Sequence, residues 1–177
     1  FRITSDKTID APLGVDYFVR LPREYHHGRS YPLVVAIHDP GVEAVRMIGL
    51  LAGECERNGY ILIAPDWAPP FSGKNFDYMG KDHHIITTAV RDASRKFNVD
   101  QDRVFAFGFG QGANFALDLA MSRPDHFAGV VAMAPAPTPQ FYRDYSKNAQ
   151  KVAIYSVTGE WSPGTDGVRK LYQNWLP

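Results

Sequence analysis

The sequence is poor in three features that would each point to a class of protein. It has one cysteine, Cys55, which excludes an internal disulfide and a cysteine-based metal site. It has no excess charge, because Lys plus Arg and Asp plus Glu number 19 each, so no long-range field favours nucleic acid or an acidic membrane. No apolar run approaches the ~20 residues of a membrane span. We therefore expect no nucleic-acid partner, no membrane span, no metal and no cofactor.

The length and apolar content are those of one folded unit. A chain of 177 residues, 45% of them hydrophobic, is predicted to form a single domain over residues 1–177. Residue 1 is phenylalanine rather than methionine, so we expect the native N-terminus to lie upstream. The domain is expected to be incomplete at both ends and part of a larger protein or assembly, which leaves the compartment open, secretion included.

Apolar patterning predicts alternating strands and helices. Residues 15–21 alternate with a period of two, typical of a half-exposed edge strand. The runs 33–37, 60–64 and 127–133 are continuously apolar, typical of parallel strands covered on both faces, and residues 152–157 predict a further strand. Helical spacing links them, and this order predicts a three-layer α/β/α sandwich with a mainly parallel sheet. Its last strand is expected to lie outside the chain or to come from another chain.

One of these helices carries two histidines near its start. Asp82 is predicted to cap a helix whose buried stripe is Ile86, Val90, Ala93 and Phe97. His83 and His84 fall in its first turn, where we expect exposed side chains.

A glycine-rich turn between a strand and a helix, over residues 103–114, is the most informative stretch. Gly108, Gly110 and Gly112 fit the nucleophile elbow G-x-S-x-G except that glycine replaces serine. Gly108, Gly110 and Ala113 also fit the dinucleotide pattern G-x-G-x-x-G/A. That second pattern requires a carboxylate at the end of the next strand, and none follows residues 127–133. Dinucleotide binding at Gly108 to Ala113 nevertheless remains one alternative.

Four segments, taken in order, carry a resemblance to a known family. Residues 31–41, 59–66, 102–112 and 122–131 resemble the α/β-hydrolase superfamily, in its serine esterase, feruloyl-esterase, polyhydroxybutyrate-depolymerase and peptidase-like branches. The likeness covers about residues 15–160. It implies an α/β-hydrolase-like fold and a Ser-His-Asp/Glu site that transfers acyl groups from esters or amides.

At the positions that match this site, the chain departs from the family. The nucleophile position is Gly110, which has no attacking atom. The resemblance implies that Gln111 supplies one oxyanion amide and that a residue two past His38 supplies the other. That residue is Pro40, which has no N–H. Asp39 beside it would add negative charge where an oxyanion forms.

The remaining catalytic positions depart as well. Where the resemblance implies an acidic residue after strand 152–157, Ser162 holds the aligned place and Glu160 is the nearest substitute. The histidine expected after one more strand is absent from the 177 residues. A water activated by His38, with Asp39 orienting the imidazole, is one alternative, whereas the favoured interpretation is a hydrogen bond of His38 within its own turn.

Aromatic residues gather in the loops that should surround this site. We expect an aromatic crevice that accepts a small apolar or aromatic ligand, or a segment of a protein partner. Its residues are Trp67, Phe71, Tyr78, Phe141, Tyr142 and Trp161. The sequence thus predicts a catalytically impaired pseudo-esterase domain with a binding or structural role. The other alternative is part of an active serine ester or peptide hydrolase completed by residues outside this chain.

Overall fold

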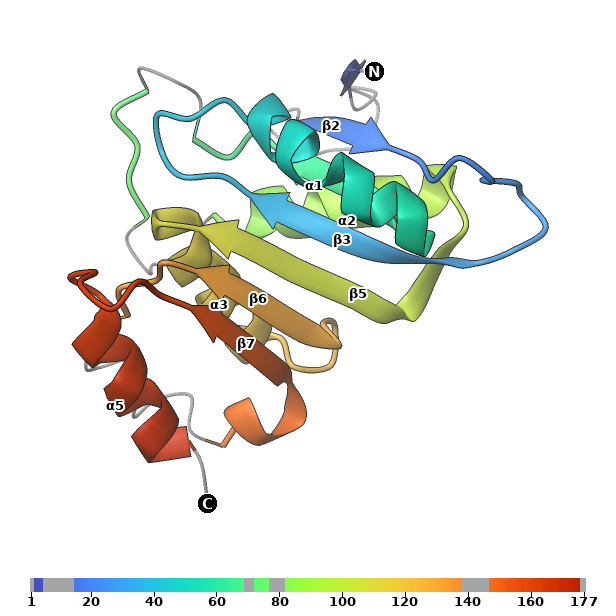
Figure 1. Cartoon of the computed structure of the whole chain (residues 1–177). Helices are drawn as coiled ribbons and strands as arrows, with labels where there is room; N and C mark the ends of the chain where they lie inside the picture. Colours follow the sequence, from blue (N-terminus) through green and yellow to red (C-terminus); the bar gives the residue numbers. More distant parts are fainter. Residues whose placement is uncertain (1, 5–14, 69–71, 77–81, 138–146, 176–177) are drawn as a thin grey trace.

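The computed structural model describes residues 2–4, 15–68, 72–76, 82–137 and 147–175 (Figure 1). Its elements alternate along most of the chain, as the apolar patterning predicted. In order they are β1 (Arg2–Thr4), β2 (Asp16–Arg20), β3 (Tyr31–Ile37), α1 (Val45–Asn58), β4 (Ile61–Pro65), α2 (His83–Lys96), β5 (Val99–Phe109), α3 (Gln111–Ser122), β6 (Gly129–Met133), the 3-10 turn η1 (Ala149–Lys151), β7 (Ala153–Val157) and α5 (Thr165–Trp175).

The strands form one seven-stranded sheet in the order β1-β2-β4-β3-β5-β6-β7. The five strands from β4 to β7 are parallel, and β1 and β2 join antiparallel at one end. β2 is half-exposed as predicted, but it is not the edge, because β1 pairs with its outer side. The mainly parallel sheet is confirmed.

Helices cover both faces of this sheet, which gives the three predicted layers (Figure 1). On one face, Met47 and Cys55 of α1 pack in a small cluster with Ala36 and Phe107. The other face lies under α2, α3 and α5, whose buried residues share the larger core cluster. α3 is the most deeply buried helix, since nine of its twelve residues are buried. Because α3 is packed so tightly, the turn between β5 and α3 is held in place.

The start of α2 differs from the prediction. The side chain of Asp82 makes no capping hydrogen bond; instead it is buried and forms an ion pair with Lys74 at 2.7 Å. His83 is also buried, at 6% exposure, and only His84 is exposed as expected. Because α2 begins against α3, its first turn faces the core rather than solvent.

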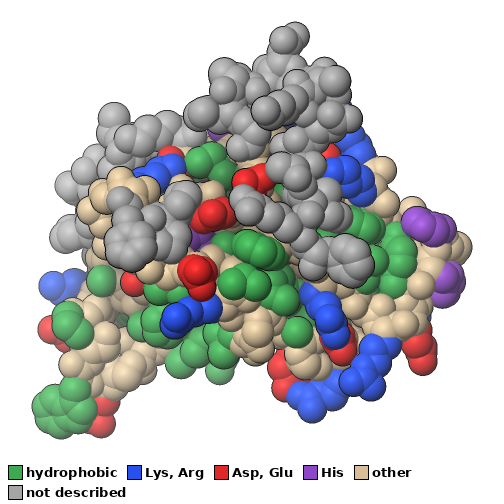
Figure 2. Space-filling model, turned by 90° about the horizontal axis from the view of Figure 1, so that it is seen from above, with side chains coloured by type: hydrophobic (Ala, Val, Ile, Leu, Met, Phe, Trp, Pro, Cys, Tyr) green, Lys and Arg blue, Asp and Glu red, His purple; other side chains and the backbone are tan. Residues whose placement is uncertain are grey.

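Surface charge is dispersed, in keeping with the equal numbers of acidic and basic residues. On the face in Figure 2, Lys and Arg side chains are interspersed with Asp and Glu, and hydrophobic side chains lie between them. Among the helices within the described ranges, none combines the length and apolar character needed to cross a bilayer.

Candidate functional site

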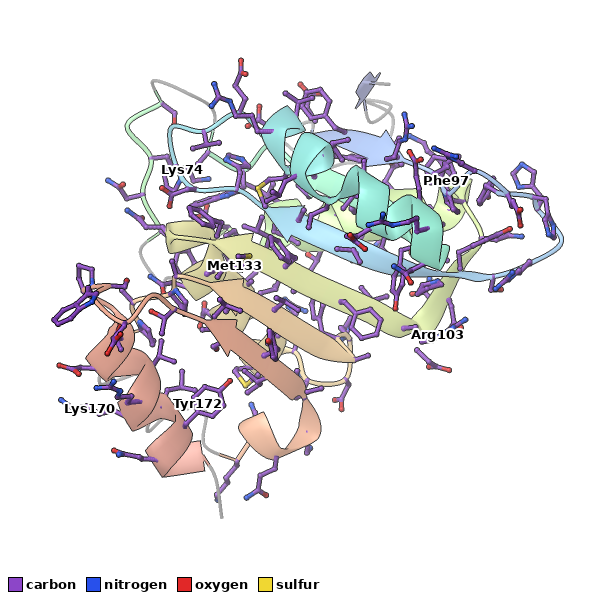
Figure 3. All side chains as sticks on the ribbon, viewed as in Figure 1. Lys74, Phe97, Arg103, Met133, Lys170 and Tyr172 are labelled. Carbon is purple, nitrogen blue, oxygen red and sulfur yellow. The ribbon has the colours of Figure 1, made fainter. Side chains whose placement is uncertain are left out.

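The site is built around the sharp turn between β5 and α3, where the sequence predicted an elbow. Gly110 occupies the tip with φ 59° and ψ −124°, a conformation that costs an L-residue roughly 1–3 kcal/mol. Its N–H donates to the carbonyl of Met133 at 3.0 Å, which ties the tip to β6. Figure 3 marks Met133 at the carboxyl end of its strand, beside this turn. Strand, turn and helix therefore meet at the edge of the sheet where ligands bind in such folds.

Two further glycines permit this turn because no side chain fits there. A Cβ on Gly108 would lie 2.2 Å from the carbonyl oxygen of Gly112. A Cβ on Gly112 would lie 2.3 Å from the carbonyl oxygen of Ile37. Both distances are far below van der Waals contact, so α3 can start directly against β3 and β5 only with glycine at these positions.

The Asp39 carboxylate lies beside the tip of the turn, where a side chain on residue 110 would begin. One carboxylate oxygen, Oδ1, accepts a hydrogen bond from the backbone N–H of Gln111 at 2.6 Å. A Cβ on Gly110 would lie 2.5 Å from this same oxygen. In active hydrolases the amide at this position of the elbow donates to the oxyanion, and here that N–H donates to the Asp39 carboxylate.

His38 and Pro40 flank this aspartate on the loop after β3. The His38 ring is fully buried, and its Nδ1 lies 2.9 Å from the carbonyl oxygen of Asp39, so the imidazole hydrogen-bonds within its own turn. Its Nε2 lies 3.6 Å from a carboxylate oxygen of Asp66. Burial lowers the pKa of His38, although the Asp39 hydrogen bond and the Asp66 charge oppose this shift. A neutral ring is therefore favoured. Pro40 offers no N–H to the site.

The side chain of Gln111 holds a loop over the elbow. Its Oε1 accepts the backbone N–H of Phe76 at 3.1 Å, and Nε2 lies 3.4 Å from the side-chain oxygen of Asn75. Lys74, on the same loop, forms an ion pair with Asp82, and its ammonium group lies over the ring of Trp67. This role of Gln111 could not be predicted from the sequence, because its partners are backbone and side-chain groups of a distant loop.

The predicted aromatic crevice is corrected at Trp67. This residue is 1% exposed, packs edge-to-face on Phe115 at 4.9 Å, and donates its indole N–H to the carbonyl of His38 at 2.8 Å. Trp67 is thus a core residue, and its hydrogen bond to His38 supports the loop that follows β3. Trp161 lies at the opposite extreme, at 93% exposure. The other four predicted crevice residues lie outside the described residues: Phe71, Tyr78, Phe141 and Tyr142.

The predicted acid positions lie on the turn that follows β7. Glu160 is exposed and Ser162 is half-buried, with its N–H bonded to the carbonyl of Gly159 at 2.9 Å. The structure brings together Gly110, Gln111 and the His38 loop, because Asp39 of that loop accepts the hydrogen bond of the Gln111 amide.

Among the described residues, no group of three or more His, Cys, Asp or Glu side chains is arranged to hold a metal ion. The N-terminus of α3, where a pyrophosphate would bind in a dinucleotide site, carries the Asp39 carboxylate.

The sheet order, the glycine elbow between β5 and α3, and the histidine loop after β3 together define an α/β-hydrolase fold. Comparisons with known proteins agree. Residues 77–168, just over half of the chain, match the family described as Phospholipase/Carboxylesterase, and the chain belongs to this family. It is thus an esterase-like α/β-hydrolase domain.

Individual relatives are esterases. The chain is 28% identical over 180 residues to an acetylxylan esterase of Coprinopsis cinerea, covering 91% of this chain and 46% of the relative. The solved acetyl xylan esterase from Aspergillus awamori is similar with a TM-score of 0.66 and 24% identity, over 80% of this chain and 53% of that one. A ferulic acid esterase is similar with a TM-score of 0.74 and 15% identity, over 92% and 79%. The chain spans about half the length of the acetylxylan esterases that it matches in sequence.

Proposed function

We propose that this chain is a catalytically impaired esterase-like domain that has a binding or structural role and does not hydrolyse esters. The observation that carries the proposal is the position of Asp39. Its carboxylate accepts a hydrogen bond from the Gln111 amide at 2.6 Å and lies where a serine side chain at position 110 would begin.

Each part of acyl transfer meets an obstacle at this site. Gly110 has no attacking atom, and losing the nucleophile of a serine hydrolase costs about a millionfold in turnover. The oxyanion of the tetrahedral intermediate needs donors at the elbow, and a loss of one donor costs roughly 10²–10³ in turnover. Here the Gln111 amide faces a carboxylate, and Pro40 has no amide hydrogen. Asp39 would also repel the developing negative charge.

A fluorophosphonate probe and p-nitrophenyl acetate test this proposal, with an acetylxylan esterase as the positive control. We expect no covalent labelling of the chain and no hydrolysis above the buffer rate. Gly110→Ser is expected to remain unlabelled, because the new side chain would collide with Asp39 and lack a second oxyanion donor. Labelling of the unmodified chain, or turnover well above buffer, would refute the proposal.

The alternative of an active hydrolase draws on the length comparison, since the chain spans about half of its acetylxylan esterase relatives. In that case residues outside the chain complete the site. It predicts that Gly110→Ser turns over p-nitrophenyl acetate, or that a longer polypeptide containing this chain does so unmodified.

Dinucleotide binding at Gly108 to Ala113 is disfavoured, because Asp39 opposes a pyrophosphate at the start of α3. Titration with NAD(H) should accordingly give no saturable change in tryptophan fluorescence.

A further inference from the structure

A second concave surface lies far from the elbow, at the other end of α3. It is a groove of about 580 Å³ between α2, the start of β5, and the turn that links α3 to β6. α3 has 12 residues, and at 1.5 Å per residue it is roughly 18 Å long, so Arg123 at its end lies about that far from Gly110. The groove is therefore separate from the candidate site. Its volume falls within the range that small organic ligands occupy.

Three arginines line this groove: Arg91 and Arg95, one turn apart on α2, and Arg123, which follows α3. All three are exposed. The ion pairs that the described residues form engage other arginines, namely Arg20, Arg23, Arg57, Arg103 and Arg169. Three guanidinium groups thus face one groove without a carboxylate held against them in the described part of the chain.

The wall of the groove adds further polar groups. The hydroxyl of Ser94 is buried and has no hydrogen-bond partner among the described residues. His84 and His126 also line the surface. Asp102 and Asp125 are the carboxylates present, so the formal charge of the lining is +1 with both histidines neutral: three arginines less two aspartates. In a chain with no net charge this is a local excess of hydrogen-bond donors and positive charge.

The floor of the groove is apolar. Val104 and Phe127 line it with only 2% and 3% of their surfaces exposed, and half-buried Val90 lies beside them. A ligand that uses the whole groove would place an aromatic or hydrocarbon body on this floor and an acidic group among the arginines. Guanidinium groups suit such a group because their planar N–H donors match the oxygens of a carboxylate, sulfonate or phosphate.

We propose that this groove binds amphiphilic organic anions, compounds with an apolar ring or chain and one acidic group. Neither the esterase-like fold nor the elbow assigns such a site. The apolar body lies against the half-buried Val90, with Val104 and Phe127 beneath it, and the acidic group pairs with the arginines of α2 and with Arg123. The proposal does not depend on whether the elbow catalyses a reaction.

Three matched probes test it on the folded chain. 8-Anilinonaphthalene-1-sulfonate has the apolar rings and the acidic group, N-phenyl-1-naphthylamine has the rings without the charge, and inorganic sulfate has the charge alone. We expect saturable binding of the sulfonate, at least about tenfold tighter than either other probe, equivalent to ~1.4 kcal/mol. The affinity should fall several-fold as salt rises from about 0.02 to about 0.2 M, since screening weakens exposed charge pairs.

Two variants locate the binding. The pair Arg91→Gln with Arg123→Gln should weaken sulfonate binding about tenfold, whereas Arg46→Gln, an exposed arginine on α1 outside the groove, should leave it within about twofold. Circular dichroism checks that each variant stays folded. Equal affinity for the neutral probe, no saturable sulfonate binding, or an equal loss in the Arg46 control would overturn the proposal.

Discussion

The imidazole of His83 lies 2.7 Å from a carboxylate oxygen of Asp118, and both side chains are buried between α2 and α3. The same ring stacks on Phe115, with centroids 5.6 Å apart and planes 12° from parallel. This contact joins the first turn of α2 to the middle of the helix that the elbow starts. It explains why the first turn of α2 faces inward and positions the helix of the candidate site.

The first prediction concerns this pair. His83→Ala should lower the free energy of unfolding by about 3 kcal/mol, because it removes a buried polar partner of Asp118 and leaves a cavity beside Phe115. Its exposed neighbour is the control, since His84→Ala should change stability by less than about 0.5 kcal/mol. Urea denaturation of the two variants measures the difference. Equal effects would mean that the His83 pair contributes little.

Asp39 should stabilise the fold through its hydrogen bond with the Gln111 amide. Asp39→Ala removes a charged acceptor from the N-terminus of α3 and is expected to cost about 1–2 kcal/mol. Asp39→Asn keeps an oxygen acceptor but not the charge, so its cost should be smaller. Chemical denaturation checks the order. An Asp39→Ala variant as stable as the parent would show that water replaces the carboxylate at the Gln111 amide without loss.

The close approach of α3 to β3 predicts a large effect at Gly112. Gly112→Ala would bring a methyl group 2.3 Å from a carbonyl oxygen of Ile37, and overpacking of this kind costs about 3 kcal/mol or more. Gly53 in α1 is the matched control because a Cβ there has no neighbour within 4 Å. Gly53→Ala should therefore stabilise the chain by about 0.5–1 kcal/mol through helix propensity. Thermal melting of both variants distinguishes the two signs, and a stable Gly112→Ala variant would contradict the packing described.

His38 predicts how stability depends on pH. Burial lowers its pKa in the folded state, so below about pH 6.5 the unfolded chain binds a proton that the folded chain resists. The contribution of His38 to stability is therefore complete above pH 6.5 and is lost as the pH falls through the lowered pKa. Denaturation of the parent and of His38→Gln between pH 8 and pH 5 should give curves that converge toward acid. Parallel curves would exclude His38 as the cause.

Much of the fold could be predicted because it depends on local patterns. The continuous apolar runs identified the parallel strands, and the glycines of the elbow marked a strand, a turn and a helix in the right order. The resemblance placed Gly110, Gln111, His38 and Pro40 near one another, and the structure brings them to the same edge of the sheet. These features follow from periodicity and from the small set of residues that a sharp turn permits.

Contacts between distant residues could not be predicted in this way. His83 lies in the first turn of a helix, where side chains are usually exposed, and only the packing of α2 against α3 buries its ring. Trp67 follows a strand in a loop rich in aromatics, and only the fold shows that its ring points inward.

The sequence by itself determined that the nucleophile position has no side chain and that Pro40 has no amide hydrogen, because both are properties of single residues. Only the tertiary structure decided that Asp39 fills the space and accepts the Gln111 amide, because that contact joins residues 72 positions apart. It also decided that two arginines of α2 and Arg123, which follows α3, face one groove. Spacing along a chain does not fix which side chains of separate elements meet, whereas packing around a shared core does.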